Sequence, residues 1–104
     1  MDNTYPNDIL KHIDDLQKDI GAAKNISDVE KAWEHFYRIK GYVERTWPND
    51  KATMESCRRL KSGLSQYTLD VREGMPSPCI GWHVELTALR RLVSPRYDKD
   101  GWPL

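Results

Sequence analysis

Three histidines are the side chains in this sequence best suited to bind a metal ion. His12, His35 and His83 fall in three different predicted helices, and no two of them have the i, i+4 spacing of a helical zinc site. A metal site would require the fold to bring these rings together with a carboxylate such as Glu34 or Glu85. We therefore expect histidines that pack against other side chains or lie at the solvent edge, and we expect no bound metal or cofactor.

Carboxylates gather in the first predicted helix, where Asp14, Asp15 and Asp19 lie close together. Neighbouring carboxylates can transfer protons in catalysis or hold Mg²⁺. Here they alternate with Lys11 and Lys18, a pattern typical of a solvated helix surface. The serines and cysteines have no obvious base beside them, and the six glycines are scattered instead of forming a phosphate-binding loop. The sequence therefore predicts that the protein is not an enzyme.

Basic and aromatic residues of the second half are the best candidates for contact with another macromolecule. Cations can pair with phosphates or carboxylates, and aromatic rings can stack on bases or anchor a protein interface. The predicted partner-binding residues are Arg58, Arg59, Lys61, Arg72, Arg90, Arg91, Arg96, Tyr97 and Trp102. We expect them to bind another protein; the alternative is a nucleic acid or nucleotide bound by a basic face of the third and fourth helices.

The charges are balanced overall but unevenly distributed. The chain has 16 Lys and Arg and 16 Asp and Glu, so its formal net charge is zero. Residues 1–30 hold three lysines and seven acids, a balance of −4, which leaves +4 for the remainder. The acidic segment can pair with the basic remainder within one subunit or between two. A neutral chain also argues against strong nonspecific DNA binding, which is typical of basic domains.

The elements that must position these residues are helices. The clearest pattern is a stripe of apolar residues at spacings of 3, 3, 4, 3 and 4, which places them on one face of a long helix. Such a face must pack on a partner surface, either elsewhere in the chain or on a second copy. The stripe consists of Met54, Cys57, Leu60, Leu64, Tyr67 and Val71.

Start and stop signals divide the chain into four predicted helices. The second has the strongest start, a capping box formed by Ser27 and Glu30, and Pro48 ends it. Gly41 lies within it, and we expect this glycine to let another helix approach closely, whereas Gly63 lies on the side of the third helix away from the stripe. The predicted helices run from Thr4 to Gly21, from Ser27 to Trp47, from Asn49 or Asp50 to Glu73, and from Ser77–Pro78 to Val93.

These lengths predict an all-α antiparallel bundle of about four helices with a long central hairpin formed by the second and third. The outer helices have about 16 residues and the central ones about 20–24, so at about 1.5 Å per residue the central pair is the longer. The apolar surface that the central pair leaves uncovered predicts a homodimer, because twofold pairing is the commonest way to cover it.

The C-terminal residues are predicted to form a segment distinct from the bundle. Residues 1–94 are the predicted helical domain, and residues 95–104 have no helical period and form an aperiodic tail. The tail carries Tyr97 and Trp102, whose rings are costly to leave in water. Either Trp102 covers the helix ends or it anchors a partner; the sequence favours neither.

Cysteine content and hydropathy predict the compartment. Cys57 and Cys79 do not form a disulfide framework, and no metal-ligand spacing accompanies them. We find no signal peptide and no apolar run near the ~18 residues of a membrane span. The sequence therefore predicts a soluble, cytoplasmic protein that does not contact membranes.

Size and class together suggest a function. A small helical chain without catalytic motifs is similar to many phage- or plasmid-encoded inhibitors and adaptors, although no motif carries this resemblance. The expectation is a non-enzymatic protein-binding module, for example an inhibitor that occupies a surface of a larger complex.

Overall fold

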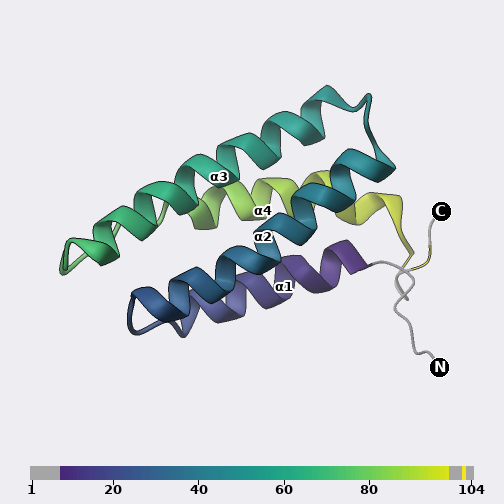
Figure 1. Ribbon diagram of the computed structural model, residues 1–104. Coiled ribbons are helices and arrows are strands. Elements are labelled where there is room, and N and C mark those ends of the chain that lie inside the picture. The colour runs from purple at the N-terminus through teal and green to yellow at the C-terminus, as the bar shows by residue number, and fades with distance from the viewer. Residues whose placement is uncertain (1–7, 99–101, 103–104) are drawn as a thin grey trace.

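The computed structural model describes residues 8–98 and 102, and this part of the chain contains helices and no strand. The predicted all-α class with four helices is confirmed (Figure 1). The elements are α1 (Asp8–Gly21), α2 (Ile26–Thr46), α3 (Lys51–Arg72), α4 (Gly81–Val93) and the short 3₁₀ helix η1 (Ser94–Arg96). Thr4, the predicted start of the first helix, lies outside the described residues.

The helices pack as two pairs that form a flat molecule. α1 packs mainly on α2 and α3 mainly on α4, whereas α2 joins the two pairs by packing on α3 and α1 contacts α4 only lightly (Figure 1). The molecule measures 43 × 33 × 20 Å. As predicted, the second and third helices are the longest, with 21 and 22 residues against 14 in α1 and 13 in α4. None of these helices is both long and apolar enough to cross a membrane.

All four helices contribute to one core. The predicted stripe of α3 faces this core: Cys57, Leu60 and Leu64 are buried, and its other three members are partly buried against them. Burying an aliphatic side chain of this size stabilises the fold by about 1.5–3 kcal/mol. The largest fully buried side chains are Ile9, Ile13, Leu16 and Ile20 of α1, Val29, Phe36, Ile39 and Val43 of α2, Leu60 and Leu64 of α3, and Leu89 and Val93 of α4.

The predicted capping box of α2 is wrong by two residues. The helix begins after Asn25, whose Oδ1 accepts a hydrogen bond from the backbone N–H of Asp28 at 3.0 Å. Asp28 Oδ2 in turn accepts from the N–H of Lys24 at 3.0 Å. Asparagine caps a helix as well as serine does, and the earlier start places Ile26 against the core. Packing therefore decides between two local signals of similar strength.

The start of α3 follows the local sequence. Asp50 is its N-cap, and Oδ1 of this residue accepts from the N–H of Thr53 at 3.1 Å. Its other end is also as predicted, because Gly74 follows the helix with a φ of 72°, a conformation that glycine adopts at little cost.

The predicted start of α4 at Ser77–Pro78 is wrong, because the helix begins only at Gly81. The preceding loop is held by Asp70, a buried carboxylate of α3. Its Oδ2 accepts from the backbone N–H of Cys79 at 2.8 Å, and its Oδ1 accepts from Gln66 Nε2 at 2.8 Å. This hydrogen bond ties the loop before α4 to the last turns of α3, and the segment after Ser77 is not helical.

Close approach of two helices occurs at Gly63 and not, as predicted, at Gly41. A Cβ atom on Gly63 would lie 2.8 Å from both the N and the Cα of Trp82, so the start of α4 rests directly on the backbone of α3. A Cβ atom on Gly41 would meet only the side chain of Arg45. The absence of a side chain at Gly63 therefore permits the α3–α4 contact.

Candidate functional site

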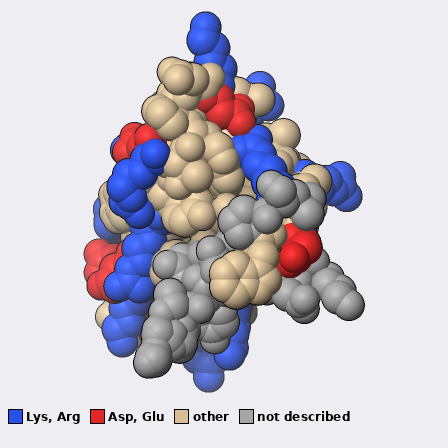
Figure 2. Space-filling view, turned by 90° about the vertical axis from the view of Figure 1, so that its right-hand side faces the viewer, with Lys and Arg blue, Asp and Glu red and all other residues tan. Residues whose placement is uncertain are grey.

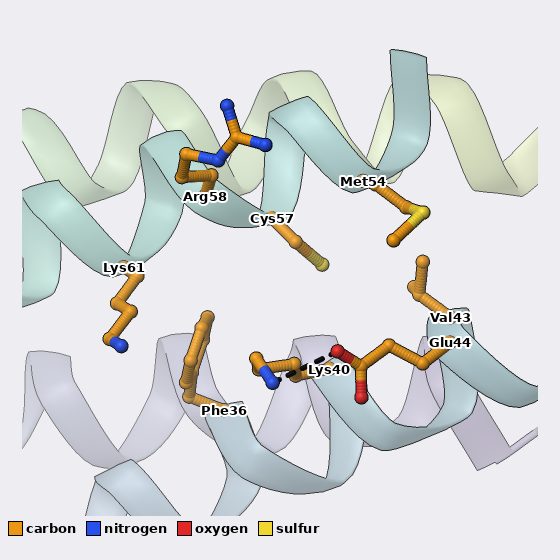
Figure 3. A pocket seen from close by; sticks show the side chains of 8 residues that line it. All are labelled: Phe36, Lys40, Val43, Glu44, Met54, Cys57, Arg58 and Lys61. Carbon is orange, nitrogen blue, oxygen red and sulfur yellow. Dashed lines mark hydrogen bonds and ion pairs between the residues drawn. The ribbon is translucent and has the colours of Figure 1, made fainter. Parts of the chain in front are cut away.

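A groove between α2 and α3 is the best-formed pocket among the described residues. Its volume is about 260 Å³, and its two walls are successive turns of the long helices (Figure 3). The lining residues are Phe36, Lys40, Val43 and Glu44 of α2 and Met54, Cys57, Arg58 and Lys61 of α3.

The floor of the groove is apolar. Phe36, Val43 and Cys57 are buried and continuous with the core, and the partly buried Met54 closes one end. Burial raises the pKa of the Cys57 thiol to about 11. At neutral pH this side chain is therefore protonated, and it behaves as a small apolar residue instead of a nucleophile.

The rim of the groove is charged and mainly basic. Lys40 Nζ lies 2.9 Å from Glu44 Oε2 on the same helix. On the α3 side of the groove, Arg58 pairs with Glu55 of the same helix. Lys61, also on α3, is exposed and makes no ion pair with another described residue. The free charge at this rim is therefore that of Lys61.

The predicted partner-binding residues do not form one surface. Arg58 and Lys61 lie at the groove, whereas Arg59 and Arg91 line a separate hollow between α3 and α4. Arg72 is exposed in the last turn of α3. In a view of the end of the molecule that carries the α2–α3 connection, Lys and Arg are interspersed with Asp and Glu around other residues (Figure 2).

Two of the predicted cations pair with carboxylates of another helix or helix cap. Arg90 of α4 pairs with Asp14 of α1. Arg96 donates from Nη2 to Asp50 Oδ2 at 2.5 Å and to Thr53 Oγ1 at 2.9 Å, and its guanidinium carbon lies 4.4 Å from the centre of the Trp47 ring. Arg96 thereby ties the C-terminal segment to the start of α3.

The two aromatic residues of the predicted tail have different environments. Tyr97 is buried, and its hydroxyl shares a hydrogen bond with the hydroxyl of Tyr42 at 2.9 Å. Burial, followed by this hydrogen bond, raises the pKa of Tyr97 above its ordinary value. Trp102 is 58% exposed, and its backbone N–H donates to Asp98 Oδ1 at 2.9 Å. The packed part of the chain thus extends to Tyr97, and the indole of Trp102 remains available for contact.

A second, polar site lies between α1 and α2, although residue spacing along the chain predicts no metal site there. His12 and Asp15 of α1 meet His35 of α2, and one potential ligand atom of each residue lies within 4.8 Å of those of the other two. Neither Glu34 nor Glu85, the carboxylates that we considered from the sequence, belongs to this cluster.

Residue spacing along the chain predicts only part of this cluster. His12, Asp15 and Asp19 have i, i+3 and i+7 spacing, which places them on one face of α1, but His35 reaches them only through helix packing. The rings of His12 and His35 are 6.0 Å apart. The third histidine, His83, lies elsewhere.

Two charged side chains next to the cluster, Asp19 and Lys11, each pair with one of its members. His35 Nε2 lies 2.9 Å from Asp19 Oδ2, and Lys11 Nζ lies 3.0 Å from Asp15 Oδ2. The hydrogen bond from Lys11 is the main cause that lowers the pKa of Asp15. Asp15 is therefore a carboxylate at neutral pH.

Comparison with known proteins matches no family model, no curated protein and no solved structure. The geometry of these two sites is therefore what points to a function.

Proposed function

We propose that the protein is a non-enzymatic protein-binding module whose α2–α3 groove receives apolar side chains from a helical segment of a partner. The observation that carries this proposal is the combination of a buried apolar floor with an unpaired cation, Lys61, at the rim. An amphipathic helix that carries acidic residues beside its apolar face fits such a groove. The inhibitor or adaptor role expected from the sequence is compatible with this mode of binding.

The dimensions of the groove favour side chains over a small molecule. A volume of about 260 Å³ is below the ~300–1,000 Å³ typical of pockets for small ligands. Its open, elongated form between two helices instead fits one or two large side chains of a longer partner.

Charge pairing makes the nucleic-acid alternative less well supported. Arg58 and Arg59 share Glu55 as their ionic partner, and Arg90 pairs with Asp14. Phosphate binding depends on cations that are free to neutralise the backbone. Most of the arginines proposed for that role already have a carboxylate beside them.

We also propose that the helices form an antiparallel bundle, that two copies associate, and that the protein resides in the cytoplasm. The four-residue connections at positions 22–25 and 47–50 support the antiparallel order of the helices.

Exposed apolar residues such as Tyr37 and Val84, at 56% and 66% exposure, support association of two copies. The free thiols of Cys57 and Cys79 fit a reducing compartment. Light scattering tests the dimer, and a mass near that of the 12.2 kDa chain would contradict it.

Selection from a displayed library of helical peptides tests the binding mode. We expect the enriched peptides to carry large apolar residues flanked by Asp or Glu, and Lys61→Glu to weaken their binding about tenfold. Arg72→Glu is the matched control, because it reverses a charge on α3 away from the groove, and it should retain binding. Equal loss in both variants, or enrichment of basic peptides, would reject the proposed groove.

A further inference from the structure

We propose that His12, Asp15 and His35 bind one Zn²⁺ ion at the α1–α2 interface, independently of the groove. The cluster combines two imidazoles and one carboxylate, which are ordinary ligands of zinc in proteins. All three residues are partly buried, and one potential ligand atom of each lies within 4.8 Å of those of the other two. Two helices that already pack together therefore supply three ligands from a preformed position.

The distances are close to those that a bound ion requires. Zinc–ligand bonds of about 2.0–2.1 Å place the ligand atoms of a tetrahedral site about 3.3 Å apart. Closing the gap from the present limit of 4.8 Å requires the ligand atoms to approach by at most about 1.5 Å. A water molecule or a residue of a partner would complete the fourth position.

Asp19 has the position of a residue that orients a metal-binding histidine. His35 Nε2 lies 2.9 Å from Asp19 Oδ2, while His35 Nδ1 is buried without a hydrogen-bond partner among the described residues. A proton held on Nε2 by the carboxylate leaves the lone pair on Nδ1, which is the form of imidazole that coordinates a metal. The geometry therefore assigns Nδ1 as the ligand atom of His35 and Asp19 as its positioning residue.

The donor set selects zinc over the abundant hard cations. Mg²⁺ and Ca²⁺ prefer sites built from oxygen ligands, whereas imidazole nitrogen favours zinc and its neighbours in the first transition series. Two of the three donors here are imidazoles. Zinc should bind this site and magnesium should not.

Lys11 opposes the ion that we propose. Its ammonium group lies 3.0 Å from Asp15 Oδ2, so an incoming dication must share this carboxylate or displace the lysine. Removing the positive charge of Lys11 should tighten zinc binding about fivefold, because an ammonium group beside the site repels the dication even through water.

Calorimetric titration of the full chain with ZnCl₂, and separately with MgCl₂, tests the site. We expect one Zn²⁺ per chain, and loss of at least tenfold in affinity in both His35→Gln and Asp15→Asn. His83→Gln and Glu85→Gln are the matched controls, because they make the same changes outside the cluster, and both should bind zinc as the original protein does. Zinc binding that is absent, or that survives both cluster substitutions, overturns the proposal.

Two further variants separate metal coordination from a structural role. Asp19→Ala should weaken zinc binding about 10- to 100-fold and change the visible absorption of the Co²⁺-loaded protein. Lys11→Met should tighten binding, whereas Lys51→Met on α3, which removes the same charge elsewhere, should not. Circular dichroism of the metal-free variants identifies any that do not fold. If Asp19→Ala lowers only thermal stability, with zinc affinity and the Co²⁺ spectrum unchanged, the assignment of His35 Nδ1 is wrong.

Discussion

The two sides of α2 contact neighbouring helices in different ways. On one side, Phe36 and Val43 meet α3 across a groove with an apolar floor. On the other, His35 meets Asp19 and the polar face of α1. His35 and Phe36 are adjacent in the chain, so a rotation of about 100° around one helix separates a surface suited to apolar side chains from one suited to a cation. A single long helix can therefore serve two unlike sites.

The largest expected difference between the two sides is in stability. Phe36→Ala should cost about 3–5 kcal/mol in the free energy of unfolding, because Phe36 is fully buried and truncation leaves a cavity. His35→Ala should cost about 1 kcal/mol, since the ring is partly exposed and loses mainly its contact with Asp19. Urea unfolding followed by circular dichroism measures both. Equal costs would mean that the polar cluster is as much a part of the core as the groove floor.

The reactivity of the two cysteines distinguishes the groove floor from the surface. Burial raises the pKa of Cys57 from 9.0 to about 11, so at pH 8 its thiolate fraction is about 100-fold below that of an ordinary cysteine. Cys79 is exposed and should react first with a thiol reagent; peptide mapping by mass spectrometry identifies the labelled residue. Equal labelling rates would mean that the groove opens in solution and exposes the Cys57 thiol to the reagent.

The same raised pKa predicts the direction of a pH effect on stability. The folded state favours the protonated thiol of Cys57, so its contribution is fully present below pH 9 and is lost as the pH rises through about 11. Thermal unfolding between pH 8 and 11 should show this loss, and Cys57→Ala should reduce it. A slope unchanged in Cys57→Ala would assign the effect to other groups.

A substitution at Gly63 tests whether the α1–α2 cluster is independent of the α3–α4 contact. Gly63→Ala places a Cβ atom 2.8 Å from the backbone of Trp82, and we expect a net cost of about 1–3 kcal/mol as α4 shifts. Gly41→Ala is the control and should be neutral or stabilising by up to about 1 kcal/mol, because only the flexible Arg45 side chain is near. Zinc affinity at the α1–α2 cluster should be unchanged in both. Loss of zinc binding in Gly63→Ala would show that the cluster depends on the α3–α4 contact.

The smallest expected effect is at the rim of the groove. Lys61→Glu should change the free energy of unfolding by less than about 0.5 kcal/mol, because this side chain is exposed and has no ion-pair partner among the described residues. Chemical denaturation measures this change. A larger loss would show that Lys61 stabilises the fold, so its charge reversal could not be used as a probe of binding alone.

Local sequence determined the parts of this protein that depend on near neighbours in the chain. The apolar period from Met54 to Val71 fixed the buried face of α3, and Asp50 and Gly74 fixed its ends. These signals act within a few residues, so they are already present before the helices meet. The helical class and the order of four helices followed from them.

Tertiary structure decided which distant side chains meet, because helix periodicity defines a face but not its partner. Asn25 and not Ser27 caps α2, with Ile26 packed against the core, and Asp70 holds the backbone of Cys79 in the loop before α4. Packing also brought His35 to the face of α1 that carries Asp15. The contact of His35 with α1 joins residues about 20 positions apart, and no helical spacing predicts it.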